Sequence, residues 1–533
     1  MARQRKVERK PLSFSTTMRN PERIADFVES LLDYEGQILT NELIKRIVIE
    51  WIINKLIRGD TALKAFPKLK AIYKSEGSTY TEEEAEFIYS YIEANTKGHK
   101  EAGFDKGWPS RFDTYMRLPM EFGFVYYKID QLIEISETGK LIVEANNSVD
   151  SREIETGEQV VKVSDVFLNS LVKYQTNNPF RRNKIENAPF VMFLQTVKKL
   201  QENFSWDKTG IYRSEIPFVM CWPNSNACEL AEYINEFRIS YGLKPSEEIV
   251  YEKCLDLLDS DNRVRFKMKQ ITKEGVDDFI RKLRSTGIIS LRGNGRLIDI
   301  NNFEIDRVDY IVSEYADYPI IEGEKNYYLY MGKIDKSLIE IHTAISRSDI
   351  LDIRQRTLQL WAAEMGTEEI VKEVKSLTSP NGSQHPVLKF INAPTRFEFL
   401  MSVALKHQYP NLDVKPNYPI DDEGMPTSTA RGGVGDIEVY GITEDVLVEV
   451  TMMQNKSQST NEIPGITRHL TEFQTDKDKA VFSLFVAPSI HSDTQFMIEF
   501  AKVRNNVDII PYTIENFVAK WKDSKEISGL MEI

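Results

Sequence analysis

The sequence predicts a multidomain α+β protein, with a largely helical N-terminal part and an α/β core at the C-terminus. The chain has 533 residues. Because single hydrophobic cores rarely extend beyond about 250–300 residues, roughly three or four domains are expected. Apolar residues repeat with helical spacing through much of residues 21–380. After residue 383, short apolar strands alternate with helical segments, which is typical of a mixed α/β sheet.

The overall charge is acidic, whereas the first residues are basic. A formal net charge of −13 argues against a protein that coats nucleic acid. It leaves a DNA enzyme open, because local basic patches decide the affinity for DNA. Residues 1–23 carry seven Lys or Arg against two Glu, a local charge of 7 − 2 = +5. This stretch is either an arm that neutralises phosphates or a solvated terminus, and both interpretations stay open.

The composition favours a soluble protein of a reducing cytoplasm. Hydrophobic residues make up 41% and charged residues 28% of the chain, as in ordinary globular proteins. The most apolar run, at 47–57, is interrupted by Glu50 and Lys55, so no membrane span is expected. The N-terminus lacks the apolar segment of a secretory signal. The cysteines lack the spacing of zinc ligands: Cys221, Cys228 and Cys254.

One segment of the N-terminal part combines a helix with two strands. Residues 110–122 have helical spacing, and two strand-like runs follow Gly123. A helix followed by a two-stranded wing resembles a winged-helix DNA-binding module. In that interpretation Arg111 and Arg117 lie on or near the recognition helix, and Lys128 lies at the wing tip. A small α+β subdomain with solvated arginines explains the segment equally well.

The same order of elements returns later in the chain, with a clearer turn. Residues 273–285 have helical spacing, 288–291 and 296–300 are strand-like, and Gly293-Asn294-Gly295 forms a tight hairpin turn between them. The candidate DNA-binding residues here are the basic side chains of the helix and the turn: Arg281, Lys282, Arg284, Arg292 and Arg296. Two winged-helix-like units make double-stranded DNA the leading partner.

Composition and chain-breaking residues divide the chain into four expected domains. Residues 179–184 form a basic loop, and the Ser-Pro-Asn-Gly-Ser stretch at 379–383 is a linker. The expected domains are two DNA-recognition subdomains with winged-helix-like units, a helical linker domain, and an α/β domain that carries the chemistry: 1–150, 151–300, 301–383 and 384–533.

Three carboxylates of the last domain lie on a helix and two consecutive strands. Glu398 belongs to an apolar-periodic helix, Asp436 precedes the alternating run 437–440, and Glu449 ends the next run. Because a turn at 441–445 joins the two runs, we expect Asp436 and Glu449 side by side, with Glu398 reaching in from the helix. Such oxygens suit Mg²⁺, which activates water and offsets phosphoryl charge. Taken alone, each of these residues is better explained as a solvent-exposed carboxylate at the end of a strand or on a helix. The three together, on a helix and two strands, favour a metal site.

This pattern resembles the PD-(D/E)xK nuclease core, in which a helix with Glu precedes strands with Asp and Glu. More closely, the chain resembles the AlwI family of type IIS restriction endonucleases, which includes nicking relatives of the BstNBI kind. The resemblance also covers the order of domains. It rests on these stretches: S-F-S-T-T-M-R-N-P-E-R-I at 13–24, T-R-F-E-F-L at 395–400, D-E-G-M-P at 422–426, G-D-I-E-V at 435–439, V-E-V-T at 448–451 and E-I-P-G-I-T-R-H at 462–469. The nuclease motifs are specific, and the N-terminal match is looser.

The resemblance implies a catalytic set that uses Mg²⁺. It assigns Glu398, Asp436 and Glu449 as the metal and catalytic carboxylates. Glu462 and His469 match two further positions that complete the site, seven residues apart on one helix face if Pro464 opens that helix. That set is the candidate active site.

Two residues depart from the superfamily pattern. Gly435 stands where the superfamily has proline, and Thr451 stands where it has lysine. AlwI-like enzymes also carry threonine there, so the activity is still expected. Some other group must then position the attacking water. His469 is the best candidate, with Glu462 as a ligand of a second metal or of the water.

The resemblance implies a bacterial, cytoplasmic endonuclease that cuts double-stranded DNA at a short fixed distance from an asymmetric site, GGATC- or GAGTC-like. The opening stretch favours the first of these sites. A single nuclease domain has one hydrolytic centre, so cutting both strands requires self-association, a second nuclease subunit or a second encounter with the DNA, whereas a chain that acts only as a monomer is a strand-specific nickase. Two other functions stay open: a non-catalytic winged-helix DNA-binding regulator, and a transposition or repair nuclease that selects DNA by structure. A methyltransferase is not expected, because no glycine-rich cofactor loop follows a strand.

Overall fold

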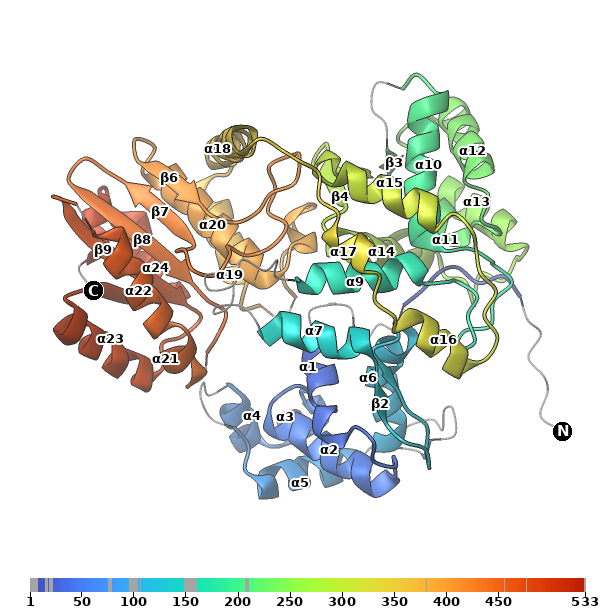
Figure 1. Cartoon of the computed structure of the whole chain (residues 1–533), viewed down its shortest axis with the longest axis horizontal. Helices are drawn as coiled ribbons and strands as arrows, with labels where there is room; N and C mark the ends of the chain where they lie inside the picture. Colours follow the sequence, from blue (N-terminus) through green and yellow to red (C-terminus); the bar gives the residue numbers. More distant parts are fainter. Residues whose placement is uncertain are drawn as a thin grey trace. The chain divides into compact units, whose positions relative to one another are not determined.

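A computed structural model of the chain describes residues 8–14, 18, 23–74, 79–94, 104–105, 107–147, 161–206, 210–379, 381–454, 456–475 and 477–531. These residues fold into two compact units (Figure 1). Unit 1 contains the described residues within Met1–Phe66, Tyr80–Asn147 and Val161–Ala344, and unit 2 those within Pro67–Thr79 and Ile345–Ile533. Most of the basic N-terminal arm and the predicted domain boundary at 150 lie outside the described residues.

Unit 1 is mainly helical, because long stretches of its sequence gather apolar residues on one helix face. In α2, for example, Ile47, Val48 and Trp51 are buried at helical spacing. Thr40 caps this helix, since its hydroxyl accepts a hydrogen bond from the N–H of Leu43. The α-helices of unit 1 are α1 (Arg23–Glu29), α2 (Asn41–Ile53), α3 (Asp60–Ala65), α5 (Glu82–Ala94), α6 (Trp108–Glu121), α7 (Glu137–Asn147), α9 (Val163–Lys173), α10 (Pro189–Asn203), α11 (Ile216–Cys221), α12 (Ala227–Tyr241), α13 (Glu247–Leu258), α14 (Gly275–Arg284), α15 (Ile305–Glu314), α16 (Glu324–Met331) and α17 (Lys336–Glu340).

Two small antiparallel sheets in unit 1 follow the predicted helix–strand–strand segments. Helix α6 leads into the pair β1–β2, and α14 leads into the pair β4–β5. The turn Gly293-Asn294-Gly295 has positive φ at all three residues, as the predicted hairpin requires. Strand β3 adds an unpredicted member to the second sheet, in the order β3-β5-β4. The order of elements is confirmed, and its assignment as a winged helix stays a prediction. The strands are β1 (Val125–Tyr126), β2 (Glu134–Ile135), β3 (Ile211–Tyr212), β4 (Ile289–Arg292) and β5 (Leu297–Ile300).

A buried ion pair holds the start of α11 against α12. The guanidinium of Arg238 binds Glu215 through two bonds, Nε–Oε1 at 2.8 Å and Nη2–Oε2 at 2.7 Å. The side chains of Arg238 and Glu215 are 0% and 2% exposed. Nη2 also donates to the carbonyl of Gly210 at 2.7 Å. The rings of Trp206 and Tyr212 lie 5.6 and 5.1 Å from the guanidinium carbon. Arg238 therefore links α12 to the start of α11 and to the described residues of the segment 206–212 that precedes it.

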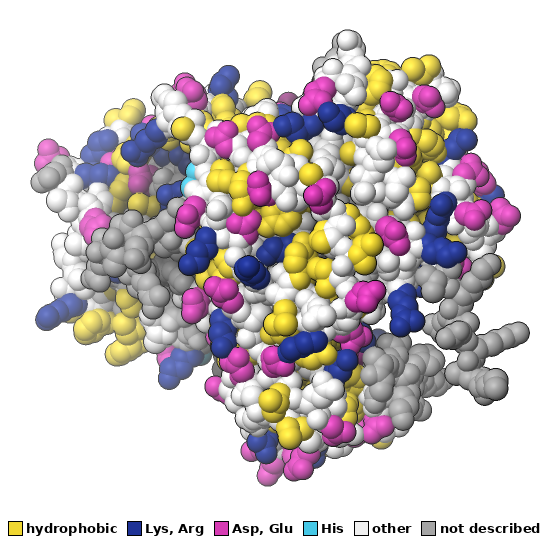
Figure 2. All heavy atoms as spheres, turned by 45° about the vertical axis from the view of Figure 1, so that its right-hand side comes forward, with side chains coloured by type: hydrophobic (Ala, Val, Ile, Leu, Met, Phe, Trp, Pro, Cys, Tyr) yellow, Lys and Arg dark blue, Asp and Glu magenta, His cyan; other side chains and the backbone are white. Residues whose placement is uncertain are grey.

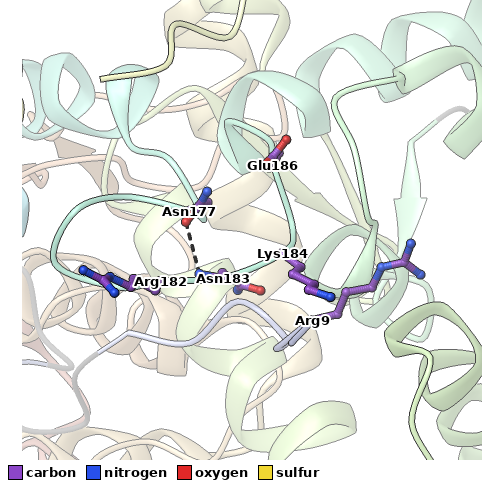
Figure 3. A pocket seen from close by; sticks show the side chains of 6 residues that line it. All are labelled: Arg9, Asn177, Arg182, Asn183, Lys184 and Glu186. Atoms are coloured by element: carbon purple, nitrogen blue, oxygen red, sulfur yellow. Dashed lines mark hydrogen bonds between the residues drawn. The ribbon is translucent and has the colours of Figure 1, made fainter. Parts of the chain in front are cut away.

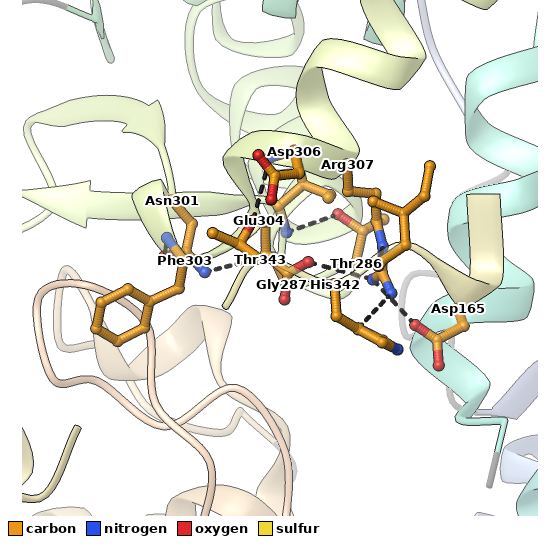
Figure 4. Close-up of polar contacts among 12 residues, drawn as sticks. Asp165, Thr286, Gly287, Asn301, Phe303, Glu304, Asp306, Arg307, His342 and Thr343 are labelled. Atoms are coloured by element: carbon orange, nitrogen blue, oxygen red, sulfur yellow. Dashed lines mark hydrogen bonds and ion pairs between the residues drawn. The ribbon is translucent and has the colours of Figure 1, made fainter. Parts of the chain in front are cut away.

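A second buried arginine, Arg307 of α15, joins three segments of unit 1 (Figure 4). Its Nη1 donates to Asp165 of α9 at 3.2 Å and pairs with Glu304 at 3.3 Å. Its Nη2 donates to the carbonyl of Ile339 and lies next to Nδ1 of His342, both at 3.3 Å. Because a guanidinium offers five donors in a rigid fork, one side chain can satisfy all these partners. Arg307 thus fixes α9 and α15 to α17 and to the chain that follows it.

Unit 2 is built on a five-stranded mixed sheet with the strand order β10-β9-β8-β7-β6. Strands β6, β7 and β8 are antiparallel, and β8, β9 and β10 are parallel. The presence of this sheet in unit 2 and of mainly helices in unit 1 confirms the mixed α/β, multidomain class that the sequence predicts. The strands are β6 (Asp413–Pro416), β7 (Ile437–Tyr440), β8 (Glu444–Val450), β9 (Ala480–Ala487) and β10 (Ile509–Thr513).

Helices pack against the sheet of unit 2 through apolar side chains. Leu447 of β8 and Phe485 of β9 form a buried cluster with Ile466 of α22 and Ile498 of α23. Elsewhere in the unit, α24 packs on α20, where the indole N–H of Trp521 donates to a backbone carbonyl at 3.1 Å. The helices of unit 2 are α4 (Pro67–Lys74), α18 (Arg347–Glu364), α19 (Thr367–Ser376), α20 (Ala393–Gln408), α21 (Ser457–Asn461), α22 (Ile463–Phe473), α23 (Ser492–Asn505) and α24 (Ile514–Asp523). The short 3₁₀ or π turns of the two units are η2 (Leu32–Tyr34), η3 (Gln270–Glu274), η4 (Asn302–Glu304), η5 (Leu388–Phe390) and η6 (Ile527–Met531).

The segment predicted as a helical linker, 301–383, is helical but is divided between the units. Helices α15 to α17 belong to unit 1, whereas α18 and α19 belong to unit 2. Helix α18 packs along α20, and Gln355 of α18 donates to the carbonyl of Val414 in β6 at 2.9 Å. The second half of the segment is therefore part of the fold of unit 2. Within the ranges that the structure describes, no helix has both the length and the apolar character needed to cross a membrane.

We predict that Gly424→Ala destabilises unit 2, because the glycine lies in a tight turn against α18. Its φ is +77°, which alanine disfavours, and an added Cβ would lie 2.6 Å from Cβ of Thr357 and 3.2 Å from the carbonyl oxygen of Ile353. Strain and overlap together should cost about 2–3 kcal/mol. Thermal unfolding of unit 2 measures the effect. Gly465→Ala in α22 is the matched control, since a Cβ there meets nothing within 4 Å. Equal melting temperatures for the two variants would contradict the prediction.

Candidate active site

Asp436 and Glu449 are neighbours across the β7–β8 hairpin. Ile437 pairs with Val448, so the next position along the antiparallel ladder brings Asp436 opposite Glu449. Directly opposed residues point to the same face, with Cβ atoms about 4.5–5.5 Å apart. The N–H of Val450 donates to Oδ2 of Asp436 at 2.8 Å, which fixes the carboxylate at the end of the hairpin. The strand pairing that the sequence predicts is confirmed.

Glu398 reaches the same cluster from α20. Its side chain is buried, and its Oε2 accepts a hydrogen bond from the N–H of Ala430 at 2.8 Å. Burial, and then the charges of Asp436 and Glu449, raise the pKa of Glu398 well above its ordinary value, against the opposing effect of the Ala430 bond. Carboxylates influence each other in this way only when they are close in a poorly solvated place. The cluster therefore has an excess of negative charge that a cation would offset.

Helix α22 brings Glu462 and His469 to the end of β8. Pro464 lies in the first turn of the helix, as predicted, and Glu462 immediately precedes it. The hydroxyl of Thr451 donates to Oε1 of Glu462 at 2.6 Å, and Nδ1 of His469 lies 2.9 Å from Oε1 of Glu449. Two contacts thus attach one helix to the strand end. The sequence alone did not predict that Thr451, in the place of the superfamily's lysine, binds Glu462.

Packing explains the glycine that precedes Asp436. A Cβ at Gly435 would lie 3.0 Å from Cγ of Leu447 and 3.2 Å from Oε1 of Glu449, and closer still to Cδ1 of that leucine. A larger residue there must shift the side chain of Leu447 and press towards the carboxylate of Glu449. Asn417, which sequence reasoning missed, holds the same segment: its Nδ2 donates to the carbonyl of Gly435 at 2.7 Å, and its N–H donates to that of Asp436 at 2.9 Å. No local pattern marked this asparagine.

The donor set fits a hard divalent cation such as Mg²⁺. This ion usually takes one or two carboxylates and keeps several waters. Asp436 and Glu449 supply a pair of carboxylates, and the pKa of Glu398 is raised first by burial and then by the charges of this pair, which a cation would offset. In the described part of the chain, no group of three or more His, Cys, Asp or Glu side chains converges as a ready-made metal site. A cation held by two carboxylates and by water does not need such a group.

The basic residues predicted to contact DNA in the first helix–strand–strand segment have partners within unit 1. Arg117 pairs with Asp113 at 2.7 Å, and Lys128 pairs with Glu324 at 2.8 Å. The guanidinium of Arg111 is half-buried over an aromatic ring of its own helix, at 5.2 Å. These side chains are therefore already engaged in contacts that stabilise the unit.

In the second segment, Lys282 and Arg284 are buried, which corrects the prediction that they are available to DNA. Lys282 is 0% exposed, pairs with Asp278 at 2.7 Å, and lies 4.5 Å from the ring centroid of Phe14. Arg284 donates to the carbonyl of Ile289 at 2.7 Å. Basic residues spaced along a helix look like a surface patch in the sequence. Here the fold buries both of these side chains, although they point to different sides of α14.

The remaining basic residues of this segment lie nearer the surface. Arg281 and Arg292 are half-buried, and Arg292 pairs with Asp299 at 3.0 Å. Arg296 is exposed, and its Nε donates to the carbonyl of Gly293 across the turn at 3.0 Å. Arg296 is the residue of this predicted set that the structure leaves most accessible.

Comparison with known proteins gives one family match and several similar structures. The chain matches the family described as AlwI restriction endonuclease over residues 120–381 and 382–519. The small subunit (R.BspD6I2) of the heterodimeric restriction endonuclease R.BspD6I is 26% identical, over 30% of this chain and 80% of that chain, with a TM-score of 0.26. Restriction endonuclease FokI is 10% identical, over 97% of this chain and 95% of that chain, with a TM-score of 0.24. FokI bound to DNA gives 10% identity, 97% and 96% coverage and a TM-score of 0.23. None of the curated proteins matches the chain.

Proposed function

Since the chain belongs to the AlwI restriction endonuclease family, we propose that it is a Mg²⁺-dependent type IIS endonuclease of the bacterial cytoplasm. The family membership makes it a site-specific DNA endonuclease. The proposal adds that it hydrolyses double-stranded DNA at a short fixed distance from a short asymmetric site, GGATC- or GAGTC-like. In this proposal, unit 1 recognises the DNA site and unit 2 hydrolyses the phosphodiester bond.

The observation that carries the proposal is the cluster of three carboxylates at the end of the β7–β8 hairpin. Asp436 and Glu449 lie opposite each other, and the pKa of Glu398 is raised by its burial and, after that, by the charges of these two carboxylates. A fold gains no stability from crowding like charges, because each must be desolvated beside the others. Costly charge clusters of this kind are typical of functional sites.

Each residue of the proposed site has a distinct part in the chemistry. Asp436, Glu449 and Glu398 form the proposed metal site: the opposed pair Asp436 and Glu449 is proposed to bind the cation directly, and Glu398 to bind it through one of its waters. A bound Mg²⁺ lowers the pKa of a water and offsets the charge that develops on the scissile phosphate. His469, oriented by its contact with Glu449, is proposed to position the attacking water. Glu462, oriented by a threonine hydroxyl, is the second polar group proposed to hold that water or a further metal.

One carboxylate cluster hydrolyses one phosphodiester bond at a time. A chain that acts alone is therefore expected to nick a single strand. Cutting both strands requires a second nuclease domain, from another copy of the chain, from a different subunit or from a second encounter with the DNA. The stoichiometry of the cleaving complex decides between a nickase and a double-strand endonuclease.

The test is incubation of supercoiled plasmid with Mg²⁺, followed by run-off sequencing of both strands. Breaks at a constant offset from one short sequence, dependent on the metal, are expected. The same data show whether one strand or both are cut. Intact plasmid across several DNAs and metals would favour the non-catalytic DNA-binding regulator. Random breaks, or a preference for branched DNA, would favour a nuclease that selects by structure.

We expect Gly435→Ala to slow cleavage by about ten- to a hundredfold, because misplacing a catalytic group by about 1 Å costs on that order. The added Cβ pushes against Leu447 and towards Glu449 on the neighbouring strand. Single-turnover rates on a site-containing duplex measure the effect. Gly366→Ala is the matched control, since a Cβ there meets nothing within 4 Å. A wild-type rate for Gly435→Ala would show that the proposed site tolerates the shift.

A further inference from the structure

A hollow of about 490 Å³ lies on the surface of unit 1, where the described N-terminal residues meet the loop that follows α9 (Figure 3). The side chains around it are strongly polar: Arg9, Asn177, Arg182, Asn183, Lys184 and Glu186. Three cations against one carboxylate give a local charge of 3 − 1 = +2, in a chain whose net charge is −13. The hollow combines the basic arm and the basic loop of the sequence, neither of which the proposed site uses.

Asn183 ties the two walls of the hollow together. The N–H of Lys10 donates to its Oδ1 at 2.9 Å, and its Nδ2 donates to the carbonyl of Lys10 at 2.8 Å, although the two residues are 173 positions apart. Its own N–H donates to Oδ1 of Asn177 at 3.1 Å. The N–H of Lys184 donates to the carbonyl of Glu8 at 3.3 Å. Residues 8–10 of the arm are thus fixed against the loop by backbone and side-chain hydrogen bonds.

Two further asparagines fix the rest of the loop. Asn178 is 2% exposed, and its Oδ1 accepts the N–H groups of Phe180 and Arg181, both at 3.0 Å. Asn187 is 1% exposed and donates to the carbonyl of Trp222 at 2.9 Å. Buried amides are uncommon, because they must be desolvated and fully hydrogen-bonded. Here they hold one backbone conformation, which presents the loop's cations with little further ordering to be lost on binding.

The loop directs its cations outward at selected positions. Arg181 turns inward, where its Nε donates to the buried Glu121 at 2.7 Å, whereas Arg182 and Lys184 are exposed. Figure 3 shows Lys184 beside Arg9, with Arg182 extending in another direction from the loop. Among the residues that the structure describes, no carboxylate forms an ion pair with Arg182 or Lys184. This separates them from most of the predicted DNA-binding residues, which have partners.

We propose that this hollow binds the phosphates of the DNA backbone through Arg182 on one side of the loop and Lys184 on the other, with Arg9 beside Lys184. The inference rests on the proposed function and adds a contact surface outside both helix–strand–strand segments. A duplex presents closely spaced phosphates, and cations on a fixed loop bind them irrespective of base sequence. On the face drawn in Figure 2, Lys and Arg side chains are interspersed with Asp and Glu. Because the whole chain carries a net charge of −13, DNA is attracted only where cations outnumber carboxylates locally, as they do in this hollow.

The test measures DNA binding by the full chain carrying Asp436→Asn, so that the DNA stays intact. The Asp436→Asn chain is the parent. Its DNA affinity is compared with that of the same chain carrying Arg182→Gln/Lys184→Gln, on a site-containing duplex and on a duplex of unrelated sequence, from low to moderate salt. We expect roughly tenfold weaker binding to both duplexes, and a plot of log affinity against log salt that is shallower by about two. Glu186→Gln, which removes the carboxylate of the hollow, should bind both duplexes more tightly.

The matched control is Lys64→Gln/Lys244→Gln, which removes the same charge from exposed positions of unit 1 outside the hollow. Its affinity and salt dependence should equal those of the parent. If Arg182→Gln/Lys184→Gln also equals the parent while the parent binds DNA, the hollow is not a DNA contact, and the proposed function stands. If the parent binds no DNA, the proposed function itself fails. If Arg182→Gln/Lys184→Gln loses binding of inorganic phosphate but keeps the parent's affinity for both duplexes, the hollow is a site for the free anion instead.

Discussion

Asp436→Asn is expected to abolish DNA cleavage and to leave the metal-free protein at least as stable as the wild type. The asparagine keeps an oxygen that accepts the N–H of Val450, so the hairpin end is retained. It removes a charge that raises the pKa of the buried Glu398, and so relieves repulsion in the folded state. A lost metal ligand removes several kcal/mol of transition-state stabilisation, which is about a thousandfold or more in rate.

Two measurements separate this catalytic role from a structural one. Single-turnover cleavage in Mg²⁺ gives the rate, and thermal unfolding in chelator gives the stability of the metal-free protein. Added Mg²⁺ should raise the melting temperature of the wild type but not of Asp436→Asn. Glu438→Gln is the matched control: Glu438 lies on the same strand, and its carboxylate accepts the hydroxyl of Tyr440 at 2.6 Å. It should cleave normally. Cleavage by Asp436→Asn within tenfold of the wild type would exclude Asp436 from the chemistry.

The β-strands of the site could be predicted from the sequence because their pattern is local. Ile437 and Val439 alternate with polar residues, and a short turn at 441–445 leaves one simple pairing with the next strand. The observed pairing is the predicted one, and it alone brings Asp436 and Glu449 together. Helix α22 could also be predicted from a local signal, because Pro464 lies in its first turn.

The parts that could not be predicted depend on contacts between residues far apart in the sequence. Lys282 follows Asp278 by one helical turn, and only the packing of Phe14 over it shows that the pair is buried. The bond between Thr451 and Glu462 needs the helix to be placed against the strand. Sequence patterns report which face of an element is apolar, but not which polar groups that face meets. The sequence therefore predicted the pairing of the two strands better than it predicted which charged side chains are exposed and which polar groups they contact.

Arg238→Met is expected to destabilise unit 1 by about 3–5 kcal/mol at neutral pH, because breaking a buried pair leaves one charge without its partner. Methionine fills part of the space between the rings of Trp206 and Tyr212 but cannot bind Glu215 or the carbonyl of Gly210. Because the chain has two units, hydrogen exchange of the amides in α11 and α12 is the appropriate measurement, together with thermal unfolding. Exchange should accelerate there and stay unchanged in the sheet of unit 2.

The loss should also depend on pH. Burial raises the pKa of Glu215, and Arg238 opposes that effect, so Arg238→Met raises this pKa further. The cost of burying the ionised carboxylate is therefore largest at high pH. It disappears as the pH falls below the unfolded value of about 4.3, where the group is protonated in both states. The stability difference from the wild type should narrow between neutral and acidic pH. Arg263→Met, which breaks an exposed pair with Glu248, should change little at any pH. A difference independent of pH would show that Arg238 acts through packing rather than through its charge.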